Sequence, residues 1–222
     1  GHSGEAPTHP VLLNDLAACF VENGWSLKWL HREILQSATW QQSIYNPSAQ
    51  KTDPANEHFA RMNRRRLDVE AWRDAMLHAS GQLDKTLGGE PKDLNAKDNN
   101  RRTLYGAIHR REPNQFLRIH DFPDSTAHAP TRPQTITPLQ QLFTLNGPFI
   151  HQQAKSLAAN LMKQKEINVR IHGVYQKLFQ RAPRETELKI AKNFLNGKGN
   201  DASAWTQYAH ALLAGNEFQF ID

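Results

Sequence analysis

Seven polar residues of this sequence have side chains that can carry protons or hold an anionic group. Three are candidate general acids or bases, because imidazole and carboxyl groups exchange protons in enzymes: His31, Asp74 and Asp121. Four are candidate binding residues, because guanidinium and amide groups donate hydrogen bonds to ligand oxygens: Arg65, Arg66, Arg132 and Asn146. If the seven gather beneath one loop, Asp121 is the expected base, Arg66 or Arg132 holds an anionic group, and His31 shuttles a proton.

A structural use of the arginines competes with this hypothesis. Acidic residues closely follow the arginine run 64–66, and Arg66 and Glu70 have the i,i+4 spacing of an ion pair on a helix. The formal net charge of +5 raises nucleic-acid binding as a third alternative. No nucleic-acid-binding motif or aromatic platform accompanies the charge, so the sequence favours charge pairing within the chain.

His31 also has a structural interpretation. It belongs to an apolar stripe whose spacing is that of one helical face, formed by Leu27, Leu30, His31, Ile34, Leu35 and Ala38. The stripe predicts that His31 points into a core, where a histidine is more often a hydrogen-bonded structural residue than a catalyst. The tryptophans, including Trp72, are likewise expected to fill the core or its rim unless they line a groove.

Common catalytic and metal-binding motifs are missing from the sequence. The single cysteine, Cys19, excludes a disulfide within these residues, a CxxCH haem attachment and a multi-cysteine zinc site. None of the eleven histidines has another histidine four residues away, and there is no HExxH, GxSxG, GxGxxG or Walker motif. His120-Asp121 would indicate a metal centre only if further ligands converged on it. We therefore expect this chain to bind neither a metal nor a cofactor.

Helical periodicity dominates the segments that must position these residues. Helices are expected over residues 9–22 and after Ser26, as a hairpin, within residues 62–81, and over most of the chain from Thr137 onward. Residues 45–56 and 120–138 are expected to be loops. Residues 88–100 are expected to be mobile, and 103–108 to be a short extended segment.

These patterns predict a mainly α fold, a multi-helix bundle of packed helical hairpins with long irregular loops and at most a short β element. The 222 residues suit a single helical domain. Two subdomains, 1–120 and 137–222, joined by a proline-rich loop at 121–136, are the alternative. No apolar run approaches the roughly 18 residues of a membrane span.

Six stretches together span nearly the whole chain, namely HPVLLNDLAACFVENGWSLKWLHREILQSATWQQS, DPAN, RMNRRRLDVEAWRDAMLHASGQLD, HDFPDSTAHAPTRPQTITPLQQLFTLNGPF, RIHGVYQKLFQRAPRETELKIAKNFL and HALLAGNEFQFID. Through these stretches the chain resembles domain of unknown function 1553, a planctomycete-specific module at the C-terminal end of large exported proteins. The sequence departs from the family pattern at Val11, Trp40 and His120, where an acidic residue, tyrosine and phenylalanine are usual. The pattern also begins ahead of Gly4, so a site completed by that part is expected to be incomplete here.

The resemblance implies an exported protein, periplasmic or at the cell surface, in which a cytochrome-c-like haem domain and a second module precede this one. It implies no particular reaction. Our leading hypothesis is an accessory module, not catalytic alone, that packs against those preceding domains. The alternative is part of an enzyme or glycan-binding site that acts on polysaccharide, formed by the seven polar residues beneath the loop at 120–138.

Overall fold

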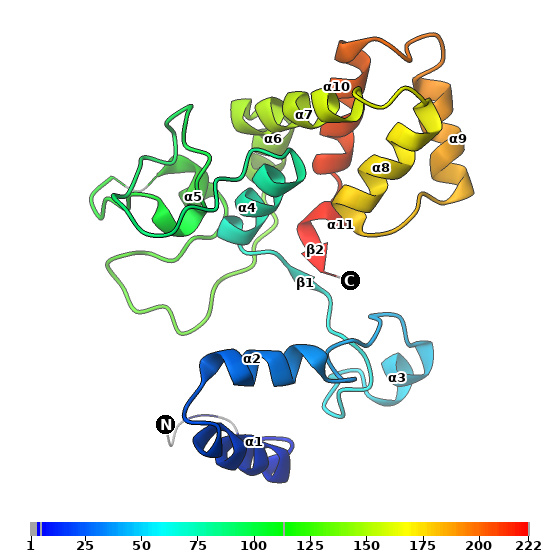
Figure 1. Cartoon of the computed structure of the whole chain (residues 1–222). Helices are drawn as coiled ribbons and strands as arrows, with labels where there is room; N and C mark the ends of the chain where they lie inside the picture. The colour runs from blue at the N-terminus through cyan, green and yellow to red at the C-terminus, as the bar shows by residue number, and fades with distance from the viewer. Residues whose placement is uncertain (1–3, 5, 113, 222) are drawn as a thin grey trace. The chain divides into compact units, whose positions relative to one another are not determined.

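The computed structural model describes residues 4, 6–112 and 114–221. These residues form eleven α-helices, one 3-10 helix and one two-stranded sheet. Figure 1 labels the α-helices and the strands. The mainly α fold class predicted from the sequence is therefore confirmed. No helix among the described residues is both long enough and apolar enough to cross a membrane.

Contacts divide the chain into an N-terminal unit that ends at Arg65 and a larger unit, Arg66–Ile221. This division falls elsewhere than the boundary that the sequence suggested in the proline-rich loop at 121–136. Helices from both sides of that loop pack together, because α4 (Val69–Ala79) contacts α7 (Pro148–Leu161). The segments before and after the loop therefore share one core.

In the N-terminal unit, α1 (Pro10–Glu22) and α2 (Leu27–Gln36) contact each other, as the predicted hairpin requires. Pro10 lies in the first turn of α1, where its missing N–H costs no hydrogen bond. Ser26 caps α2, because its hydroxyl accepts a hydrogen bond from the Trp29 N–H at 3.2 Å.

The expectation of a loop over residues 45–56 is wrong in part, because α3 (Pro47–Thr52) lies within it. Pro47 begins this helix instead of breaking it. The side chain of Asn46 accepts a hydrogen bond from the Ala49 N–H at 3.1 Å and so caps the first turn. One proline and one capping residue are therefore enough to form a short helix here.

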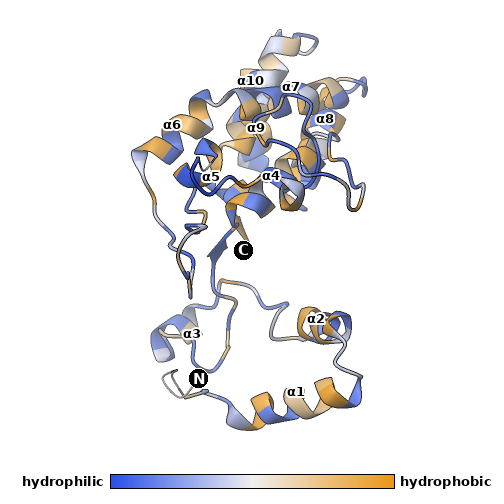
Figure 2. Ribbon diagram, turned by 90° about the vertical axis from the view of Figure 1, so that its left-hand side faces the viewer, coloured by the Kyte–Doolittle hydropathy of each residue, from blue (hydrophilic) through white to orange (hydrophobic). Residues whose placement is uncertain are grey.

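The predicted burial of His31 is also wrong. His31 is exposed, and neither α1 nor α2 contains a buried residue. Among the described residues of the N-terminal unit only Ala49 and Asn56 are buried. Figure 2 shows hydrophobic positions along both helices. The helical period was correct, but nothing within the unit covers the apolar stripe that carries His31.

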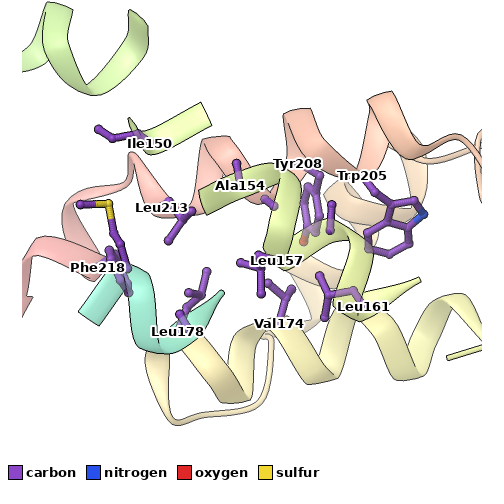
Figure 3. Packing of buried hydrophobic residues seen from close by; sticks show 14 of the residues in the cluster. Ile150, Ala154, Leu157, Leu161, Val174, Leu178, Trp205, Tyr208, Leu213 and Phe218 are labelled. Carbon is purple, nitrogen blue, oxygen red and sulfur yellow. The ribbon is translucent and has the colours of Figure 1, made fainter. Parts of the chain in front are cut away.

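The core of the larger unit lies where α7 and α10 (Ala202–Leu213) pack against each other, with α8 (Ile167–Phe179) beside them. Figure 3 shows Leu157 of α7 next to Val174 of α8, with Trp205 of α10 in the same cluster of buried residues. All three side chains are fully buried. Such burial contributes about 1.5–3 kcal/mol for each large apolar side chain relative to exposure.

Shorter elements complete the larger unit. The helices are α5 (Gln115–Ile119), α6 (Pro138–Asn146), α9 (Glu185–Phe194) and α11 (Asn216–Gln219). In the sheet, β2 (Phe220–Ile221) pairs with β1 (Arg65–Arg66), whose first residue is the last of the N-terminal unit. The predicted start of a helix at Thr137 is confirmed, because Thr137 and Gln140 form a reciprocal capping box.

The extended segment expected over residues 103–108 is a 3-10 helix at Thr103–Tyr105, followed by a single β-bridge between Gly106 and Lys92. The carboxylate of Asp74 accepts hydrogen bonds from both the N–H and the hydroxyl of Thr103, each at 2.7 Å. This anchor to α4 fixes a turn where the sequence pattern indicated a strand.

Candidate functional site

The structure brings together three of the seven candidate residues. Arg66, Asp121 and Arg132 line one small pocket beneath the proline-rich loop at 121–136. The other four lie elsewhere. The catalytic and binding roles of all seven remain predictions.

His31 is exposed on α2, and Arg65 is exposed at the end of the N-terminal unit. Asn146 is exposed at the end of α6, where its amide donates to the Leu142 carbonyl at 3.2 Å. Asp74 is occupied by Thr103 and also lies 3.6 Å from the Arg102 guanidinium. Within the larger unit, Asp74 and Asn146 therefore do not line the pocket that holds the other three, and His31 and Arg65 belong to the N-terminal unit.

Asp121 is held by hydrogen bonds from three residues. Its carboxylate accepts from the Arg66 guanidinium at 3.0 Å, from the N–H and hydroxyl of Thr135 at 3.0 and 2.6 Å, and from the Gln140 amide at 3.2 Å. Burial pushes the pKa of Asp121 up, but these hydrogen bonds and the positive charge of Arg66 outweigh it and hold the pKa below its usual range. A carboxylate so stabilised is a weak general base at neutral pH.

The predicted helical pair between Arg66 and Glu70 is wrong. Arg66 lies before the start of α4 at Val69, so the i,i+4 geometry of a helix is not available to it. Its guanidinium donates instead to Asp121 and, at 2.5 Å, to the Thr135 carbonyl. The partner of Arg66 comes from the loop and not from its own segment.

Glu70 pairs with Arg132 through two parallel hydrogen bonds of 2.6 and 2.8 Å. Burial raises the pKa of the Glu70 carboxyl, but the Arg132 guanidinium outweighs it and lowers the pKa overall. The two ion pairs, Arg66 with Asp121 and Arg132 with Glu70, fasten the loop to the segment that begins α4. Both arginines already have carboxylate partners, which favours a structural role over an anion clamp.

A cavity of about 250 Å³ lies beside this cluster, wholly within the larger unit. We call it the Trp72–His120 cavity. Its lining is formed by Arg66, Leu67, Val69, Trp72, His120, Ile136, Gln140, Gln141, Thr144, Leu145, Ala214, Asn216, Gln219 and Phe220. The walls therefore come from α4, from the turn after α5, and from α6, α11 and β2.

Two of the lining residues have a buried ring nitrogen without a hydrogen-bond partner. Trp72 is 4% exposed and His120 is 7% exposed, and their ring centroids lie 5.0 Å apart. Among the described residues, neither Nε1 of Trp72 nor Nε2 of His120 has a hydrogen-bond partner. Buried polar groups nearly always have a hydrogen-bond partner. Two unpaired ring nitrogens on residues that line one cavity therefore require an explanation.

Sequence reasoning did not place these two residues in a site. Trp72 was expected to be a core or rim filler, and its burial fits that expectation. The dipeptide His120-Asp121 was considered only as a metal ligand. No group of three or more histidine, cysteine or acidic residues within the described ranges is arranged to hold a metal ion. The sequence offered one signal for the cavity. A tryptophan fills the core or its rim unless it lines a groove, and Trp72 does line the cavity.

The fold and the cavity define a mainly helical module with a loop tied down by ion pairs and a small cavity beside it. Residues 1–195 match the family model described as PSD1, Protein of unknown function (DUF1553), and the chain belongs to this family. The match ends before α10, which supplies part of the core. No curated protein and no solved structure shows significant similarity to the chain.

Proposed function

We propose that the chain is an accessory interaction module of an exported, haem-associated multidomain protein. Its α1–α2 hairpin packs against the domain that precedes it in the same polypeptide. The module is not catalytic by itself, and any haem belongs to the preceding domain, since the sequence printed here contains no CxxCH site.

The observation that carries this proposal is the uncovered apolar face of α1 and α2. We call it the hairpin face, and its large exposed residues are Val11, Leu12, Leu13, Val21, Trp25, Leu27, Ile34 and Leu35. Leu27 is 62% exposed and Leu35 is 50% exposed. Large exposed apolar side chains gathered on two contacting helices are typical of a protein–protein contact.

The neighbouring domain is the occupant that best fits the hairpin face. Pro10 begins α1 close to residue 1, so a domain ahead of this chain is tethered to the hairpin through the same polypeptide. Such a tether gives an effective concentration on the order of millimolar. Residues 10–36 contain three acidic and two basic side chains, so the recognition is mainly apolar and not electrostatic.

The alternative, an enzyme or glycan-binding site formed by the seven polar residues, has less support. Asp74 and Asn146 do not line the pocket beneath the loop, and His31 and Arg65 belong to the other unit. The remaining three are engaged in ion pairs, with Asp121 accepting four hydrogen bonds. Neither a free base nor an unpaired arginine clamp is left among them.

A double variant of the full-length polypeptide tests the docking. Leu27→Ser with Leu35→Ser removes two apolar side chains from the hairpin face. Loss of even one such contact costs about 1.5 kcal/mol, so undocking should rise at least about tenfold. Limited proteolysis at the junction ahead of α1 measures the undocked fraction.

The matched control is Leu104→Ser with Ile190→Ser, since these side chains are 71% and 67% exposed in the larger unit. It should leave the cleavage rate unchanged. Equal cleavage in both double variants would contradict the proposal. So would a full-length polypeptide that has no folded domain ahead of this chain.

A further inference from the structure

The Trp72–His120 cavity points to a second function, separate from docking. We propose that it binds an uncharged, hydroxyl-bearing molecule of about the size of one sugar ring. Nε1 of Trp72 donates a hydrogen bond to such a ligand and Nε2 of His120 accepts one. The site lies wholly in the larger unit and does not depend on the hairpin face.

The hydrogen-bonding character of His120 follows from its other ring nitrogen. Nδ1 lies 2.8 Å from the Phe116 carbonyl, and a carbonyl can only accept, so the proton lies on Nδ1. Burial lowers the pKa of His120, which keeps the ring neutral at pH 7. Nε2 therefore presents a lone pair as an acceptor.

Trp72 supplies the opposite character, because an indole N–H can only donate. A hydroxyl group both donates and accepts, so it is the simplest group that satisfies the two nitrogens. A buried polar group left without a partner costs about 1–3 kcal/mol. Binding of a hydroxyl-bearing ligand removes that cost at both positions.

The rest of the lining selects against charge. Four of its side chains are amides, from Gln140, Gln141, Asn216 and Gln219, which offer donors and acceptors without net charge. Among the described residues that line it, Arg66 alone carries a charge, and the Asp121 carboxylate already pairs with it. An anionic ligand would also face the lone pair of His120, so a neutral ligand fits better.

The cavity has room for one ring. An apolar cavity of about 150 Å³ can hold benzene, so about 250 Å³ accommodates a six-membered ring with hydroxyl substituents. Apolar side chains of Leu67, Val69, Ile136 and Leu145 are placed to cover the less polar face of such a ring.

Entry of the ligand requires a small movement of the wall. Both orphan nitrogens are fully buried atoms, so a neighbouring side chain must shift before a ligand reaches them. Ile136 is 76% exposed and follows the proline-rich loop, which makes it the lining side chain with most freedom to move. The free energy needed for this movement lowers the affinity for every ligand, but it does not change the preference for an uncharged, hydroxyl-bearing one.

The test is titration of the intact chain with five neutral probes, namely D-glucose, D-galactose, D-mannose, N-acetyl-D-glucosamine and myo-inositol, followed by calorimetry and ligand-observed NMR. D-Glucuronate serves as the charged comparison. The methyl glycosides of the three hexoses distinguish a free sugar from the end of a longer chain. We expect saturable binding of at least one neutral probe and weaker binding of glucuronate than of glucose.

His120→Phe keeps a ring of similar size but removes the acceptor, and should weaken the binding at least about fivefold. The matched control is His78→Phe, which changes an exposed histidine on the same α4 that carries Trp72 and does not line the cavity. Thermal melting confirms that both variants are folded. Absence of binding by all five probes would overturn the proposal, as would equal affinities of the two variants.

Discussion

Replacement of Asp121 by asparagine tests whether the loop is held by the bonds that the structure shows. The substitution keeps the size of the side chain but removes its charge and one of its two acceptor oxygens. The amide oxygen of asparagine can take the place of Oδ2, which accepts from the Arg66 guanidinium and the N–H of Thr135, and the new amide donor then faces the Thr135 hydroxyl, which can accept. The Arg66 and Thr135 donors then keep a neutral partner but lose a charged one, in a site where the Asp121 side chain is only 13% exposed.

The expected loss is about 3 kcal/mol. Hydrogen bonds to a charged group contribute about 1.5–3 kcal/mol each and neutral ones about 0.5–1.5 kcal/mol, so each of the three bonds that Oδ2 accepts should weaken by about 1 kcal/mol. For a chain of this size, about 3 kcal/mol lowers the melting temperature by about 6–12 °C.

Urea unfolding and thermal melting of the intact chain measure this loss, and hydrogen exchange follows residues 122–136. Asp124→Asn is the control, because the Asp124 carboxylate accepts its hydrogen bonds, among the residues that the structure describes, from its near neighbour Thr126. A change below about 0.5 kcal/mol in Asp121→Asn, with unaltered exchange in the loop, would refute the reasoning.

The same carboxylate predicts a pH dependence. The folded-state pKa of Asp121 is depressed below the usual 3.8. Its contribution to the free energy of unfolding is therefore present above that pH and disappears as the pH falls through the folded-state pKa. The difference in unfolding free energy between the wild type and Asp121→Asn should therefore shrink below pH 3.8. Chemical denaturation in buffers across that range measures it.

Three further substitutions test other parts of the structure. Arg132→Lys keeps the charge but loses the two-pronged bond to Glu70; we expect a loss of about 0.5–1 kcal/mol, and faster proteolysis within residues 122–136 than in the wild type. Leu157→Ala leaves a cavity at a fully buried position of α7 and should cost about 2–5 kcal/mol in urea unfolding. In Gly106→Ala the new Cβ would lie 2.6 Å from the Leu94 side chain; overpacking should cost about 1–3 kcal/mol by thermal melting, and an unchanged melting temperature would contradict the packing described.

The long helices were predictable because their signals are local. Pro10, Ser26 and Thr137 mark helix starts through backbone chemistry that depends only on neighbouring residues. The sequences of the short helices α5 and α11 show no helical period. Burial of Phe116 and Phe218 in the core stabilises these two helices. Four or five residues are too few to show a helical repeat in the sequence.

The candidate site depended on pairings that no local pattern encodes. Arg66 lies 55 residues from Asp121, and Arg132 lies 62 residues from Glu70. The sequence therefore indicated the residue types but paired Arg66 with its neighbour on the chain. His31 shows the same limit, because a helical period identifies the apolar face but not what covers it.

The measurement that tests the central claim most directly is hydrogen exchange of α1 and α2, compared between the isolated chain and the full-length polypeptide. If the hairpin face docks on the preceding domain, amides of both helices should exchange much more slowly in the full-length polypeptide, while those of α7 and α10 stay equally protected in both. Equal exchange of α1 and α2 in the two proteins would contradict the account.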